Sequence, residues 1–271
     1  MDTTSLLIGL ILAALVSFLA FRSGMLNGSG AAASTVLGTI TFGAGGWQWA
    51  VMLLVFFFTS SALSRAYRAH KLRYGEDYAK DDRRDAGQVA ANGVVAAAFV
   101  VLHVALPPAA WPWFGFAGAL AAANADTWAT ELGVLSGAKP RLITHPSREV
   151  EPGTSGGVSV AGTLAALGGS VLIALSARVL EPGTGWIPVL AIAVGGLLGA
   201  VSDSFLGATV QAIYFCPVDQ HETERHPVHS CGSPTTQVRG WSWLNNDWVN
   251  VACTVAGGAA ACFVSVALSV L

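Results

Sequence analysis

The chain has 271 residues, of which 53% are hydrophobic and 11% charged, with a net charge of −2 and a mean hydropathy of +0.57. One soluble core of this length needs far fewer apolar residues, so the surplus must face lipid. The charge balance excludes the basic surface of a nucleic-acid-binding protein, and four cysteines, two of them in an apolar C-terminal run, exclude a secreted disulfide framework.

Eight apolar stretches predict membrane-spanning helices, because a bilayer core of about 30 Å needs roughly 20 apolar residues. In chain order they are 5–22, 30–46, 48–66, 87–106, 113–136, 157–180, 186–213 and 247–271. The first lacks the basic flank and cleavage site of a signal peptide. The second is short and rich in small residues, which leaves a re-entrant segment as an alternative. We therefore predict one all-α transmembrane bundle over residues 1-271, with about eight segments (range six to nine).

The basic residues predict the orientation of these helices, because Lys and Arg beside a span are retained on the cytoplasmic side. Nearly all of them fall near 67-86, 137-156 and 214-246, and only Arg178 is left for the other face. With eight spans, these loops share one side of the membrane. The sequence therefore predicts cytoplasmic loops and external termini, in the plasma membrane if the chain is prokaryotic.

A polar stripe leads into the helix expected to begin near residue 87. Asp85, Gln88 and Asn92 are spaced by three and four residues, which places them on one helical face, and Arg84 precedes them. Such a stripe is expected to line a cavity. A solvated face or a contact with lipid headgroups is the alternative for the charged run before it.

The strongest functional signal is a pair of carboxylates in the helix expected over 113–136. Asp126 and Glu131 lie in an otherwise apolar run, together with Asn124 and Thr127. A charge there costs about 3 kcal/mol or more, so it normally faces a bundle interior or a water-filled cavity. The two carboxylates are about 140° apart on an ideal helix, so they meet at one ion only if the helix breaks. A polar network joining helices is the structural alternative.

The loop after this helix predicts a phosphate site. The basic residues Lys139 and Arg141 are followed by Gly153, Thr154, Gly156 and Gly157, just before the next expected helix. Free N–H groups and the helix dipole attract anions at such a position, and the basic side chains add charge. No Gly-Lys-Ser/Thr follows, so this is not a Walker A loop. A turn without a ligand is the alternative.

A third intramembrane carboxylate, Asp203, lies in the helix expected over 186–213, with Ser204 and Gln211 after it. Asp126-Thr127-Trp128 and Asp203-Ser204-Phe205 are similar patterns, which would fit an internal repeat. Mg²⁺ is usually held by one or two carboxylates plus substrate phosphates. The sequence therefore predicts Asp126, Glu131 and Asp203 as catalytic residues and magnesium ligands, with helix packing as the alternative for Asp203.

The last polar loop carries candidate zinc ligands, which are Cys216, Asp219, His229 and Cys231. Cysteine, histidine and aspartate all bind zinc, and a cytoplasmic loop disfavours a disulfide. Asn245 and Asn246 follow where the last helix begins. They are either a helix cap or further lining of the predicted cavity.

In combination, these motifs resemble those of the domain-of-unknown-function-92 family, also called the transmembrane protein 19 family. They are Ser60-Ser61, Arg84-Asp85-x-x-Gln88-Val89-x-Ala91-Asn92-Gly93, Ala125-Asp126-Thr127 to Gly133, Pro140-Arg141, Gly153-Thr154-x-Gly156-Gly157, Asp203-Ser204-x-x-Gly207-Ala208-x-x-Gln211 and Asn245-Asn246. The resemblance runs over nearly the whole chain. That family includes plant phytyl-phosphate kinase and is distantly similar to phytol kinase, dolichol kinase and CDP-diacylglycerol synthase. Its members often carry a second cysteine where this chain has Asp219.

The resemblance implies a kinase that transfers the γ-phosphoryl group of CTP or another nucleoside triphosphate to an isoprenyl monophosphate within the bilayer. Such chemistry is mostly positioning and charge neutralisation. The three carboxylates would hold Mg²⁺ or orient the acceptor, the loop from Lys139 to Gly157 would bind the nucleotide, and Arg84, Gln88 and Asn92 would hold the prenyl phosphate. A secondary transporter with intramembrane carboxylates is the alternative, although short and nearly uncharged outer loops favour the enzyme.

Overall fold

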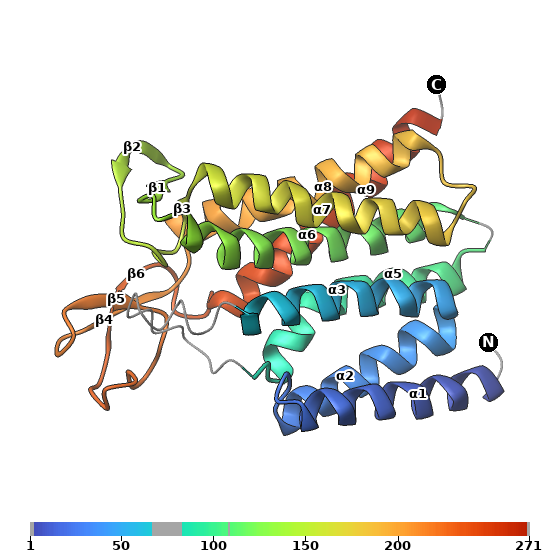
Figure 1. Ribbon diagram of the computed structural model, residues 1–271, viewed down its shortest axis with the longest axis horizontal. Coiled ribbons are helices and arrows are strands. Elements are labelled where there is room, and N and C mark those ends of the chain that lie inside the picture. Colours follow the sequence, from blue (N-terminus) through green and yellow to red (C-terminus); the bar gives the residue numbers. More distant parts are fainter. Residues whose placement is uncertain (1–2, 67–82, 108, 270–271) are drawn as a thin grey trace.

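The computed structural model describes residues 3–66, 83–107 and 109–269. The helices are α1 (Thr3–Arg22), α2 (Gly28–Ile40) continued by the π-helical turn η1 (Thr41–Gly45), α3 (Trp47–Ala66), α5 (Ala86–Ala105), α6 (Trp111–Gly133) with the 3₁₀ turn η3 (Val134–Ser136), α7 (Val160–Leu180), α8 (Trp186–Thr209) and α9 (Asn246–Ser269). They lie side by side in a bundle, with two small sheets at one end and both chain termini at the other (Figure 1). The prediction of an all-α transmembrane bundle is confirmed.

Six of these helices, α1, α3, α5, α7, α8 and α9, are long and apolar enough to cross a bilayer. Two of the eight predicted segments are of a different kind. Helix α2 has 13 residues, which at 1.5 Å per residue is shorter than a bilayer core. Helix α6 has 23 residues but a more polar sequence, and α3, α5, α7, α8 and α9 all pack against it. It therefore faces protein rather than lipid.

Small residues bring the central helices into close contact, because lipid gives helices no hydrophobic drive to associate. A Cβ atom on Gly195 of α8 would stand only 2.7 Å from the carbonyl oxygen of Gly257 on α9. Along α6, the buried stretch from Gly115 to Ala125 consists mainly of alanine and glycine. Larger side chains there would push the surrounding helices apart.

An apolar core closes the half of the bundle that lies nearer the chain termini. The ring of Trp49 lies 5.1 Å from that of Trp113 and 4.7 Å from that of Phe116. Met52 and Ile192 are fully buried in the same cluster. The polar residues of the predicted site lie instead in the other half, toward the helix ends that the loops join.

Two three-stranded antiparallel sheets cover the loop end. The first, in the order β2-β1-β3, consists of β1 (Arg141–Leu142), β2 (His145–Glu149) and β3 (Gly157–Val158). The second, in the order β5-β4-β6, consists of β4 (Ile213–Cys216), β5 (His221–Thr223) and β6 (Thr236–Arg239). These strands lie in the loops predicted near 137-156 and 214-246. The loop predicted near 67-86 lies outside the described residues as far as residue 82, and the assignment of this end to the cytoplasm stays a prediction.

Candidate functional site

Three carboxylates from separate parts of the chain act on one another electrostatically at the loop end. Asp126 on α6 is within electrostatic range of Glu224, which follows β5, and Asp203 on α8 is within range of both. Asp247 at the start of α9 adds a further negative charge near Glu224. Like charges in a poorly solvated interior repel one another strongly. The arrangement therefore favours a bound cation.

The side chain of Asp203 also favours a cation. Its Oδ2 atom is buried, and among the described residues no group donates a hydrogen bond to it. A buried carboxylate oxygen without a donor is costly unless a cation or water satisfies it. Oxygen ligands of this kind suit Mg²⁺.

Hydrogen bonds from two loops hold Glu224 in place. Ser155 Oγ and Gln211 Nε2 donate to Glu224 Oε1, at 2.8 and 2.7 Å. Burial raises the pKa of Glu224, and these two hydrogen bonds and the charge of Arg239 partly counteract that effect. Sequence reasoning missed Glu224 and Arg239, because both lie in a loop whose only distinctive pattern was its set of zinc ligands.

Glu131, five residues after Asp126 on α6, also interacts with Ser64 and Arg84. Its Oε1 atom accepts a 2.8 Å hydrogen bond from Ser64 Oγ of α3, and its charge acts on the guanidinium of Arg84. Burial lowers the pKa of Arg84 to about 10, and Glu131 opposes this shift. The guanidinium also lies 5.8 Å from the centre of the Phe56 ring. The charge of Glu131 also acts on Asp126, and the prediction that it shares one ion with Asp126 and Asp203 stays a prediction.

Asn124 forms hydrogen bonds between helices, as expected for the alternative of a polar network that joins helices. Its Nδ2 atom donates to the carbonyl oxygen of Gly169 on α7 at 2.9 Å, and its Oδ1 atom accepts from Thr59 Oγ1 on α3 at 3.1 Å. The hydroxyl of Thr127 donates to the carbonyl of Ala123 within α6. Asn124 therefore ties α3, α6 and α7 together two residues before Asp126.

The side chains of the polar stripe on α5 form hydrogen bonds with one another and with the backbone at the start of that helix. Asp85 accepts from the backbone N–H of Gln88 at 2.9 Å, and the Gln88 side chain accepts from the N–H of Asp85 at 3.2 Å. This reciprocal pair is a capping box. Asn92 Nδ2 donates to the Gln88 carbonyl at 2.9 Å. The capping box fixes the backbone beside Arg84, and a contact of this stripe with substrate stays a prediction.

The glycine-rich loop packs against α8. The N–H groups of Thr154 and Gly157 donate to carbonyls within the loop, so these two are not directed at a ligand. Gly156 has a φ of 84°, and a Cβ on it would lie 2.5 Å from the backbone nitrogen of Ala208. Gly153 also has a positive φ, of 85°. This packing places Ser155 within hydrogen-bonding distance of Glu224. A phosphate-binding role of the loop stays a prediction.

The two basic residues of this loop form exposed ion pairs. Lys139 Nζ lies 3.2 Å from Glu151 Oε1, and Arg141 Nη2 lies 3.3 Å from Glu149 Oε1. Exposed pairs of this kind contribute about 0–1 kcal/mol. Both cations could therefore exchange their partners for phosphate at little cost.

At the start of α9, the structure favours the cap over the cavity lining. Asn245 Oδ1 accepts from the N–H of Trp248 at 3.2 Å, as an N-cap residue does. The carbonyl of Asn246 accepts from Asn250 Nδ2 at 3.0 Å. Ser204 lies on α8 beside Asp203 and is half-buried.

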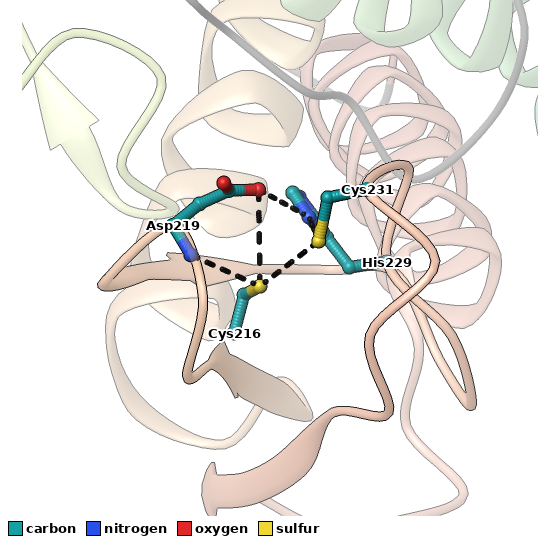
Figure 2. Close-up of side chains that lie close together, drawn as sticks. All are labelled: Cys216, Asp219, His229 and Cys231. Atoms are coloured by element: carbon teal, nitrogen blue, oxygen red, sulfur yellow. Dashed lines mark hydrogen bonds and ion pairs between the residues drawn. The ribbon is translucent and has the colours of Figure 1, made fainter.

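The four candidate zinc ligands converge in the loop between α8 and α9. The side chains of Cys216, Asp219, His229 and Cys231 point toward one another (Figure 2), and their ligand atoms all lie within 4.8 Å of one another. This is the group in the described part of the chain that could hold a metal ion through its own side chains alone.

Two shallow depressions lie elsewhere on the molecule. One, of about 320 Å³, lies between α1 and α2 and is lined by residues such as Phe18 and Thr35. The other, of about 390 Å³, surrounds η1 near Phe42 and Trp47. Neither includes a predicted site residue.

Comparison with known proteins gives consistent relationships over most of the chain. Residues 11–258 match a family described as integral membrane protein DUF92. The chain is 34% identical to Protein PGR of Arabidopsis thaliana, over 90% of this chain and 91% of that protein. It is 30% identical to an uncharacterized membrane protein of Methanocaldococcus jannaschii (93% and 91% covered) and 28% identical to one of Synechocystis (83% and 77% covered). No solved structure matches.

Proposed function

The chain belongs to the DUF92 family of integral membrane proteins, and from this premise we propose that it is a membrane-bound isoprenyl-phosphate kinase. It transfers the γ-phosphoryl group of CTP or another nucleoside triphosphate to a prenyl monophosphate such as phytyl phosphate, and the product is the diphosphate. The observation that carries this proposal is the convergence of Asp126, Asp203 and Glu224 at the loop end of the bundle. Phosphoryl transfer needs this kind of arrangement, which positions groups and neutralises charge.

The carboxylate cluster fits Mg²⁺. Asp126 and Asp203 would be its protein ligands, and the buried Oδ2 atom of Asp203 supports this assignment. Glu224 completes the negative site, and Ser155 and Gln211 keep it oriented. Bound there with the phosphates, Mg²⁺ would neutralise charge on the transferring group.

The acceptor is placed by Arg84, in our proposal. Its backbone pairs with the segment between α1 and α2, since Arg84 N donates to the Met25 carbonyl at 3.1 Å and its carbonyl accepts from Asn27 N at 3.1 Å. A guanidinium binds phosphate through two parallel hydrogen bonds, and the charge of Glu131 acts on this one. The prenyl chain can then stay in the bilayer while its phosphate reaches the carboxylate site.

The reaction itself balances without an enzyme-bound intermediate. An oxygen of the prenyl phosphate attacks the γ-phosphorus, the bond between that phosphorus and the β-γ bridging oxygen breaks, and the nucleoside diphosphate leaves. Lys139 and Arg141 lie in the loop that joins α6 and α7, and they would release Glu151 and Glu149 to meet the nucleotide. The residues of the chain thus bind and orient both substrates.

The closed apolar half of the bundle favours an enzyme over a transporter. A transporter needs a polar path from the midplane to each face. Here the rings of Trp49, Trp113 and Phe116 pack against one another between the carboxylates and the chain termini. Access from one side suffices for a kinase whose nucleotide comes from the aqueous phase.

The decisive experiment measures transfer of labelled γ-phosphate in detergent with Mg²⁺, from a panel of nucleotides to phytyl, geranylgeranyl and farnesyl monophosphates and alcohols. We expect diphosphate formation by the wild type and its loss in Asp126→Asn and Asp203→Asn. Glu181→Gln is the control, because that carboxylate lies beyond α7 at the end of the bundle away from the sheets. Absence of transfer to every acceptor by folded protein would overturn the proposal and favour the transporter.

A further inference from the structure

Two tight turns of the α8–α9 loop bring four ligand-type side chains together. Cys216 ends β4 and Asp219 lies in the β4–β5 turn, while His229 and Cys231 lie in a turn between β5 and β6 (Figure 2). That second turn is closed by the N–H of Gly232, which donates to the His229 carbonyl at 2.9 Å. Each turn therefore supplies two of the four side chains.

Four of the six distances among the ligand atoms lie near the edges of a tetrahedral zinc site. With Zn–S near 2.3 Å and Zn–N or Zn–O near 2.0 Å, a tetrahedron has edges of about 3.8 Å between sulfurs, about 3.5 Å from sulfur to nitrogen or oxygen, and about 3.3 Å from nitrogen to oxygen. The two sulfurs are 3.6 Å apart, Cys231 Sγ lies 3.3 Å from His229 Nδ1, and Cys216 Sγ lies 3.8 Å from Asp219 Oδ2. His229 Nδ1 and Asp219 Oδ2 are 2.9 Å apart.

The surroundings also suit a metal ion. The backbone N–H of Asp219 points at Cys216 Sγ from 3.5 Å, and such donors stabilise a thiolate ligand. Cys216 and His229 are buried, whereas Asp219 and Cys231 are exposed, so an ion can enter from solvent. The sulfurs are too far apart for a disulfide bond of about 2.05 Å, and both cysteines are free thiols.

We propose that Cys216, Asp219, His229 and Cys231 bind one structural zinc ion. Sulfur and imidazole ligands in a tetrahedral arrangement select zinc over the harder Mg²⁺. Four protein ligands leave no open position for a substrate or an activated water, so the ion has a structural role.

The zinc site fastens the stretch of chain that carries Glu224. This residue lies between the two turns, and its carboxylate is held from the other side by Ser155 and Gln211. Without the ion, the turns would be joined by weak contacts, and Glu224 would leave the carboxylate cluster for part of the time. This consequence rests on the proposed function, whereas the metal site itself does not.

The first test is the zinc content of the full-length chain purified in detergent without added metal. We expect one zinc per chain, with loss of the metal in Cys216→Ser and Cys231→Ser. Cys262→Ser is the matched control, because that thiol lies on α9 and contacts the carbonyl of Trp111. Wild-type protein without zinc, a disulfide between Cys216 and Cys231, or equal zinc loss in the control would each overturn the proposal.

Two further measurements test the zinc site even if the cysteine variants fail to fold. Asp219→Cys replaces the weakest ligand by a thiolate, so it should retain zinc and resist a chelator for longer than the wild type. Exchange of zinc for Co²⁺ should give the visible absorption of a tetrahedral thiolate site, which a six-coordinate ion would not show. Bound zinc without kinase activity would overturn only the proposed function. Kinase activity without bound zinc would overturn only the proposed zinc site.

Discussion

Replacing Gly156 by alanine should test how the glycine-rich loop meets α8. At a positive φ, an alanine costs about 1–2 kcal/mol, and Gly156 has a φ of 84°. The new Cβ would also lie 2.5 Å from the nitrogen and 2.6 Å from the Cα of Ala208. Such overpacking against backbone adds about 1–3 kcal/mol. The total expected loss in the free energy of unfolding is therefore about 2–5 kcal/mol.

The matched control is Gly137→Ala, at the end of η3. Gly137 also has a positive φ, of 64°, but a Cβ there would have no atom within 4 Å, so only the conformational cost of about 1–2 kcal/mol applies. Denaturant unfolding in detergent measures both variants, and phosphate transfer should fall more in Gly156→Ala because Ser155 shifts away from Glu224. Equal losses of stability would refute the packing described above. Weaker nucleotide binding at unchanged stability would favour the phosphate cradle instead.

Three other predictions concern the polar groups inside the bundle. Ser64→Ala should lower the free energy of unfolding by about 1–3 kcal/mol, because it removes the hydroxyl that donates to Glu131. An unchanged thermal stability would contradict this. Asn124→Leu should lower the free energy of unfolding by a similar amount, because it removes the donor to the Gly169 carbonyl. Thr59→Val removes only the longer, 3.1 Å hydrogen bond to Asn124, so its loss of stability should be smaller. In Mg²⁺-free buffer, the contribution of Glu224 to stability should be complete below the pKa of an unfolded glutamate and lost as the pH rises through its raised pKa. Glu224→Gln should flatten this pH dependence, and equal slopes would argue against a buried carboxylate.

Much of the architecture follows from the sequence, because length and hydropathy are local properties. Runs of apolar residues located the eight α-helices of the described residues, including α2 and α6, to within a few residues. The same patterns did not distinguish a helix that faces lipid from one that faces protein. Helix α6 became central because it is rich in alanine and glycine, which lets five neighbours approach it.

The site was predictable where a charge stood out against an apolar background. Asp126 and Asp203 were conspicuous for that reason, and the structure brings them together. Glu224 was not conspicuous, because a glutamate in a polar loop carries no signal of its own. The predicted role of Glu131 at the same ion stays a prediction, since its charge acts on Asp126 as well as on Arg84.

The sequence by itself determined the class of the molecule, its helices and the identity of its candidate metal ligands, since each depends on composition and short-range spacing. Only the tertiary structure decided which of these side chains meet. Cys216 and His229 meet because two turns fold back on one sheet, and Glu224 acts on Asp126 because the α8–α9 loop lies at the end of the bundle that carries the sheets. Contacts between residues far apart in the chain depend on how helices and loops pack, and no local pattern encodes that packing.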